Sequence, residues 1–215
     1  MWKLFKKELT LNVPPLFFAF ALFGTMVLIP NYTYIVASGY VVLQIFNYLM
    51  IANQNLSMQF TSMLPTKRND AVAATSLVIV LFELLNIAVV ALCLFPAKLI
   101  HPEGNVVGLD ANLTLLGVSL LCFATFNLVF LPKYFKTCYK IGFPVLWGLF
   151  AFLGVYAVCE TLIQVFPSVT VALDSYNPQY IWARVAVLAT GFVLYCIFTF
   201  VAVKIACKKF ENVNL

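Results

Sequence analysis

Charged residues are scarce in this sequence. Its 215 residues include thirteen Lys and Arg and eight Asp and Glu, so charged side chains make up only 10% of the chain. A typical soluble domain carries about 25% charged and about 45–50% apolar residues, whereas 63% of this chain is hydrophobic. A soluble fold cannot hide so much apolar surface, because its exterior must face water. The composition excludes an ordinary soluble domain and favours a chain whose solvent is lipid.

The residues and motifs of catalysis and metal binding are also few. The single histidine, His101, has no Cys or carboxylate partner at metal-ligand spacing. The six cysteines form no CxxC pair, so neither a zinc knuckle nor a redox motif is present, and they are expected to be free. HExxH, GxSxG and Walker motifs are missing too. We expect no enzyme, no metal site and no cofactor, and we expect that this chain cannot hydrolyse ATP by itself.

Long apolar runs make up most of the sequence. A hydrocarbon core about 30 Å thick requires about 20 apolar residues in an α-helix. Six segments reach or approach that length, at residues 15–29, 34–50, 71–95, 113–131, 143–166 and 181–206. The first is short, but its Pro14–Pro15 start suits a helix, and the fourth and fifth are expected to stop at Pro132 and Pro167. The sequence predicts an all-α membrane protein, a single transmembrane domain over 1–215 with six transmembrane helices.

The basic residues stand in short bursts between these spans, and most bursts fall on one side of the predicted membrane. Eleven of the thirteen lie there: Lys3, Lys6, Lys7, Lys67, Arg68, Lys133, Lys136, Lys140, Lys204, Lys208 and Lys209. Lys98 and Arg184 fall on the other side. Lys and Arg concentrate in cytoplasmic loops, so both termini are predicted to be cytoplasmic and the protein to lie in the plasma membrane. The bursts do not alternate with aromatic residues as in a nucleic-acid site, so the expected partner is the bilayer and not nucleic acid.

Residues 1–12 are predicted to be more than a tail. Trp2, Phe5 and Leu9 fall at i, i+3 and i+7, with lysines on the other faces. That spacing is typical of an amphipathic helix that lies in the headgroup layer of a membrane. The alternative, which the residues favour equally, is a positively charged topology anchor with a frayed end.

The segment 53–70 holds the longest polar stretch of the chain. Its first part is uncharged, so the second span can continue into the cytoplasm as a solvated helix. Pro65 then breaks the helix, because a proline disfavours helical backbone in the residue before it. The apolar Met63-Leu64-Pro65 step and the basic pair after it form a compact knob suited to docking into a partner's groove. The alternative is a loop that sets topology and contacts nothing.

Residues 61–72, Thr-Ser-Met-Leu-Pro-Thr-Lys-Arg-Asn-Asp-Ala-Val, resemble a segment of the small bacterial permeases of the type-2 ATP-binding-cassette exporter class. These permeases, found mainly in Gram-positive bacteria, show a Thr-x-x-Leu-Pro-x-Lys-Lys-x-Asp-Ile-Val run after the second span. Residues 6–9, 29–32 and 83–85 are similar to that family as well. The resemblance covers residues 1–95, and the later half matches in the number, spacing and orientation of its spans.

The resemblance implies a function. In that family two permease chains associate with two ATPase subunits, which bind the ATP and magnesium, and a short cytoplasmic helix after the second span transmits their movement. On this chain that role falls on Leu64, Pro65, Thr66, Lys67, Arg68 and Asp70. The implied cargo is a peptide, an antimicrobial compound or a lipid-like molecule moved outward. The pattern departs at residues 53–55, where similar chains carry charge. The alternative function is a non-transporting membrane scaffold, immunity protein or assembly factor.

Glu83 and Asn86 are the notable polar residues inside a predicted span. Both fall near the middle of the third span, where an ionised carboxylate costs several kcal/mol and should face protein or water. Residues three apart share one helix face. Two interpretations stay open: the pair lines a transport path, or it makes hydrogen bonds at a helix interface.

Overall fold

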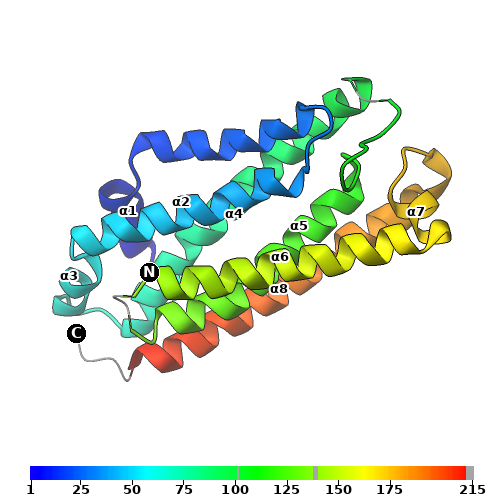
Figure 1. Ribbon diagram of the computed structural model, residues 1–215. Helices are drawn as coiled ribbons and strands as arrows, with labels where there is room; N and C mark the ends of the chain where they lie inside the picture. The colour runs from blue at the N-terminus through cyan, green and yellow to red at the C-terminus, as the bar shows by residue number, and fades with distance from the viewer. Residues whose placement is uncertain (101, 138–139, 212–215) are drawn as a thin grey trace.

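A computed structural model describes residues 1–100, 102–137 and 140–211 (Figure 1). Every regular element in these ranges is a helix, which confirms the all-α prediction. The elements are α1 (Trp2–Asn12), η1 (Pro15–Leu28), α2 (Ile35–Gln54), α3 (Ser57–Met63), α4 (Arg68–Ile100), α5 (Leu113–Tyr134), α6 (Gly142–Val165), α7 (Pro167–Leu173), η2 (Pro178–Tyr180) and α8 (Ile181–Glu211). His101 and Cys138 lie outside the described residues, and the other five cysteines are free as expected.

The predicted spans are present as long apolar helices. Among the described residues, α2, α4, α5, α6 and α8 are each long and apolar enough to cross a membrane, and α1 with η1, bent by 86°, forms a sixth candidate. The chain is therefore a multi-pass membrane protein. The amino terminus and the end of α8 lie at the same end of the bundle as α3 (Figure 1). The cytoplasmic side of that end stays a prediction.

One predicted boundary is wrong by three residues. The fourth span was expected to stop at Pro132, but α5 continues through it to Tyr134. Proline cannot donate a backbone hydrogen bond, which costs most in a helix interior; in the last turn of α5 a single bond is lost and the helical φ of the ring is retained. Pro167 does act as a break: α6 ends at Val165, and the proline becomes the first residue of α7.

The short first span is a 3-10 helix. Its 14 residues rise about 2.0 Å each and extend about 28 Å, whereas an α-helix of that length would reach only about 21 Å. The longer reach approaches the hydrocarbon thickness of about 30 Å. A three-residue period places Ala21, Gly24 and Val27 on one buried stripe. Because Gly24 has no Cβ, this stripe lies directly against Val89 of α4.

The helices form two packed groups, which contact each other where α4 packs on α8 and α5. η1 and α2 pack on α4, and α6 and α8 pack on α5, the most buried of the spans (Figure 1). Among the glycines, the tightest approach joins α5 and α8: a Cβ added to Gly191 would clash with the backbone oxygen of Gly117. Small residues that let backbones meet are a common way to hold membrane helices together, because lipid offers no hydrophobic drive between them.

Replacement of Gly191 by alanine should therefore destabilise the bundle. The new methyl group meets a backbone atom that cannot move aside, and overpacking of this kind costs about 1–3 kcal/mol. The matched control is Gly154→Ala in α6, where an added Cβ meets nothing within 4 Å and removal of a helical glycine is neutral or favourable. Thermal unfolding of both purified variants in detergent measures the difference. A Gly191→Ala variant as stable as Gly154→Ala would contradict this packing.

Candidate functional site

The segment 53–70 folds as a corner, a short helix and a turn. α2 ends at Gln54, and Leu56 takes a left-handed conformation (φ 50°) that redirects the chain into α3. The expected continuous solvated helix up to Pro65 is therefore wrong, because the α2 helix is broken nine residues earlier than Pro65, at Leu56. A non-glycine residue in this conformation costs roughly 1–2 kcal/mol, so contacts elsewhere must hold the corner in place.

The residues expected to form the docking knob have two kinds of environment. Pro65, Thr66 and Lys67 are exposed, and Leu64 is half-buried. A turn closes this stretch, with Thr66 N donating to Leu64 O at 2.7 Å.

Arg68 and Asp70, in the first turn of α4, contact the end of α8 and the amino terminus. Arg68 Nη1 donates to the backbone oxygen of Glu211 at 2.9 Å, which ties α4 to the end of α8. The Asp70 carboxylate lies 3.8 Å from the amino-terminal nitrogen of Met1. The knob thus presents its first residues to solvent and uses its last residues to join α1, α4 and α8.

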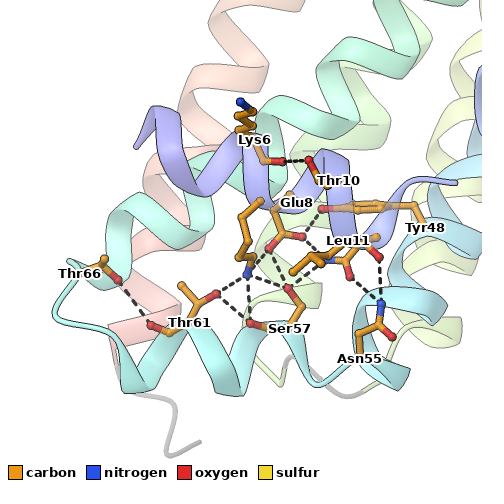
Figure 2. Close-up of polar contacts among 11 residues, drawn as sticks. Lys6, Glu8, Thr10, Leu11, Tyr48, Asn55, Ser57, Thr61 and Thr66 are labelled. Atoms are coloured by element: carbon orange, nitrogen blue, oxygen red, sulfur yellow. Dashed lines mark hydrogen bonds and ion pairs between the residues drawn. The ribbon is translucent and has the colours of Figure 1, made fainter. Parts of the chain in front are cut away.

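The helix α1 is fastened to α3 by Lys7. Its Nζ donates to Ser57 Oγ (2.8 Å), to Ser57 O (3.3 Å) and to Thr61 Oγ1 (2.5 Å) (Figure 2). The same ammonium group pairs with Glu8 Oε1 at 2.8 Å and lies 6.0 Å from the centre of the Phe60 ring. One lysine therefore reaches three side chains of α3 and a carboxylate of its own helix.

Glu8 is the centre of this cluster. Its side chain is buried, and each carboxylate oxygen has two donors. Oε1 accepts from Ser57 Oγ at 2.9 Å and from Lys7, and Oε2 accepts from Tyr48 OH at 3.0 Å and Asn12 Nδ2 at 2.5 Å. A carboxylate has about four lone-pair sites, so this one is fully satisfied. Its donors come from α1, α2 and α3, and the burial of one charge fixes three helices together.

Two asparagines complete the contact. Asn12 Nδ2 also donates to Ser57 Oγ at 2.9 Å, and Asn55 Nδ2 donates to Leu11 O at 3.1 Å and Asn12 Oδ1 at 3.0 Å (Figure 2). These bonds hold the corner at Leu56. We name the whole cluster the α1–α3 clamp; its members are Lys7, Glu8, Asn12, Tyr48, Asn55, Ser57 and Thr61.

Residues 2–12 form the helix α1, and the fully buried side of this helix carries Leu4, Glu8 and Asn12. The position of α1 in the headgroup layer and its role as a topology anchor both stay predictions. Of the predicted apolar face, Phe5 packs partly against the core and Trp2 is 72% exposed. The sequence does contain a sign of the contact between α1 and α3. Glu8 and Asn12 are four residues apart, so they form a polar pair on one face of the helix, and this face contacts the uncharged polar stretch after the second span.

Glu83 and Asn86 lie at helix contacts. Glu83 Oε2 accepts from Tyr195 OH at 2.7 Å and from Asn127 Nδ2 at 2.9 Å, which joins α4 to α8 and α5. Asn86 Nδ2 donates to the backbone oxygen of Ala37 at 3.3 Å and joins α4 to α2. Both side chains are fully buried. The two residues share a helix but contact different neighbours, and in the described part of the chain no group of His, Cys, Asp and Glu is arranged to hold a metal ion.

The opposite end of the bundle has its own polar contacts. Asp110 N donates to Asp174 Oδ1 at 2.7 Å, and Asn112 Nδ2 and Thr114 Oγ1 both donate to Leu173 O at 2.8 Å. These bonds tie the loop before α5 to the end of α7. Burial raises the pKa of Asp174 from its ordinary value to about 6. Burial also raises the pKa of Asp110.

Removal of the Glu8 carboxylate should release the clamp. Glu8→Ala removes the carboxylate that pairs with the part-buried ammonium of Lys7 and that accepts from Tyr48 and Asn12, and loss of one partner of a buried ion pair costs about 3 kcal/mol or more. The expected result is a lower unfolding temperature and faster hydrogen exchange in α1 and α3. The control is Lys6→Ala, since the Lys6 side chain points away from the clamp in Figure 2. Equal exchange in the two variants would contradict the role of Glu8.

The raised pKa of Asp174 predicts a dependence on pH. The folded protein holds this proton up to about pH 6, whereas the unfolded chain releases it near pH 3.9, so the contribution of Asp174 to stability falls as pH rises from about 4 to 6. The Asp174→Asn variant does not lose this contribution. The difference in stability between the variant and the wild type should therefore shift in favour of the variant when the pH rises from 5 to 7. Unfolding temperatures of both proteins at the two pH values test this. A difference between them that does not change with pH would refute it.

The comparison with protein families covers nearly the whole chain. A family model described as ABC-2 family transporter protein matches residues 3–210, which include the clamp, the segment 53–70 and every long apolar helix. The comparisons with curated proteins and with solved structures return no match. The match extends to the carboxyl-terminal half, where the motifs gave no resemblance. This multi-pass membrane protein thus belongs to the ABC-2 transporter family, the membrane permeases of ABC transporters.

Proposed function

We propose that the chain is the transmembrane permease subunit of an ATP-driven exporter, working with separate ATPase subunits and a second permease copy. Membership of the ABC-2 family supports the permease role. The observation that carries the partner is the surface of α3 and the turn after it. Met63 is 83% exposed and Phe60 53% exposed, beside the exposed Lys67. Apolar side chains held open on a short helix outside the spans are suited to a protein partner.

The clamp connects this surface mechanically to the transmembrane helices. α3 is bonded to α1 through Lys7 and to α2 through the shared carboxylate of Glu8. A force applied to α3 by an ATPase therefore acts on α1, α3 and the end of α2 as one body. This unit contacts α4 through the ion pair between the amino terminus of Met1 and Asp70. The helix α4 in turn contacts the end of α8 through the hydrogen bond of Arg68. We infer that nucleotide-driven movement enters the permease at α3 and spreads by these contacts.

The spans favour a cargo that is at least partly apolar. The buried side chains of Glu83, Asn86 and Asn127 each make a hydrogen bond between helices, and one oxygen of each has no partner in the described part of the chain. A groove of about 620 Å³ between α2 and α6 is lined by apolar side chains such as Val36, Leu43 and Leu146. These features support export of lipid-like molecules, amphipathic peptides or antimicrobial compounds, which can reach such a surface from the bilayer.

A charge placed on the exposed face of α3 should block association with the ATPase. Met63→Glu and Lys67→Glu each change a solvent-exposed side chain and leave the clamp intact. Loss of one anchor in an interface typically costs about 2 kcal/mol, a weakening of about thirty-fold. Co-purification of the partner ATPase with the tagged permease, and transport in reconstituted vesicles, measure the effect. Arg68 is left unchanged because it holds the end of α8.

The control reverses a charge elsewhere on the same end of the bundle. Lys136→Glu changes an exposed lysine after α5 and should leave the ATPase bound. Unchanged association and unchanged transport in both α3 variants would overturn the docking surface. A permease whose presence neither retains an ATPase nor stimulates its hydrolysis would point to the scaffold or assembly role instead.

A further inference from the structure

A second groove lies at the end of the bundle that carries the basic residues. It occupies about 640 Å³ between α5, α6 and α8. Its inner wall is apolar and includes Leu128, Ala151 and Ile205, and it opens beside two lysines, Lys133 on α5 and Lys209 on α8. None of these residues belongs to the segment 53–70 or to the clamp, so the groove is separate from the proposed docking surface.

The opening of this groove is positively charged and aromatic. Lys133 Nζ lies 4.1 Å from the centre of the Trp147 ring, so the indole holds the ammonium at the rim. Lys209 is exposed in the last turn of α8. No acidic side chain is among the described residues that line the groove. Tryptophan is enriched at the level of lipid headgroups, which places this opening at the membrane surface.

We propose that this groove binds one anionic phospholipid. Its phosphate group lies between Lys133 and Lys209, and an acyl chain follows the apolar wall toward the middle of the membrane. Basic pockets between transmembrane helices at this depth suit phospholipid headgroups. Free phosphate would leave the apolar wall uncovered, and a zwitterionic lipid would bring its own cation toward two lysines. The shape and the charge of the groove together select an anionic lipid.

The bound lipid joins three helices. Its headgroup bridges α5 and α8, and its chain fills the gap that α6 borders. The contact lies on the carboxyl-terminal group of helices, far along the chain from α3. The lipid composition of the membrane thereby acts on the part of the permease that the clamp does not hold.

Fluorescence of Trp147 reports occupancy directly, because its ring forms part of the groove. The other two tryptophans, Trp2 and Trp182, are 72% and 79% exposed and are replaced by phenylalanine. The full-length chain is reconstituted in vesicles of phosphatidylglycerol and phosphatidylcholine, with one lipid brominated to quench the indole. The expected result is preferential quenching by brominated phosphatidylglycerol. Each of Lys133→Gln and Lys209→Gln should lower that preference about five-fold.

Two further variants distinguish a specific lipid-binding site from non-specific attraction of anionic lipid to surface charge. Lys136→Gln removes the same charge just after the end of α5, outside the groove, and should keep the preference. Ala151→Phe fills the groove while both lysines remain and should abolish it. Equal quenching by the two lipids, an equal loss in Lys136→Gln, or a retained preference in Ala151→Phe would each overturn the proposal. So would displacement of the lipid by inorganic phosphate, which would show a simple anion site.

Discussion

The buried carboxylate of Glu8 is the interaction on which the end of the bundle that holds α1 and α3 depends. A charge removed from water is tolerated only where it is paired and hydrogen-bonded, and Glu8 meets that demand with four donors drawn from α1, α2 and α3. Two of these donors, Lys7 and Asn12, lie on α1 itself, and the other two, Tyr48 and Ser57, come from α2 and α3, so the carboxylate is satisfied only when the three helices meet. The amino-terminal helix, the corner at Leu56 and the orientation of α3 follow from that arrangement.

Within the spans, the solvent imposes the opposite constraint. Lipid does not bond polar groups, so backbone bonds must close within helices and side chains such as Glu83 are used to join helices. η1 extends as a 3-10 helix where too few residues separate Pro15 from the turn that follows. α5 and α8 meet through glycines. The outcome is a bundle whose transmembrane helices are held together by contacts among themselves.

The long-range part of the structure is what the sequence could not reveal. Apolar length predicts the spans, and the basic bursts place α3 and the chain ends together, because both are properties of local composition. The clamp pairs Glu8 with Tyr48 and Ser57, which lie 40 and 49 residues away, and no period within α1 identifies those partners. Glu83 likewise finds Asn127 and Tyr195 on helices that come later in the chain. The 3-10 form of η1 has no compositional signature, since the same apolar run would fit an α-helix.

The central claim is that α1 and α3 move as one body when the ATPase acts. Spin labels at Lys6→Cys on α1 and at Ser62→Cys, an exposed position of α3, in a chain without its native cysteines, report their separation in the complex with the ATPase. A second pair, at Ser62→Cys and Lys136→Cys, reports movement of α3 relative to α5. With nucleotide trapped, the account predicts an unchanged distance in the first pair and a shifted distance in the second. A change between α1 and α3, with none between α3 and α5, would contradict it.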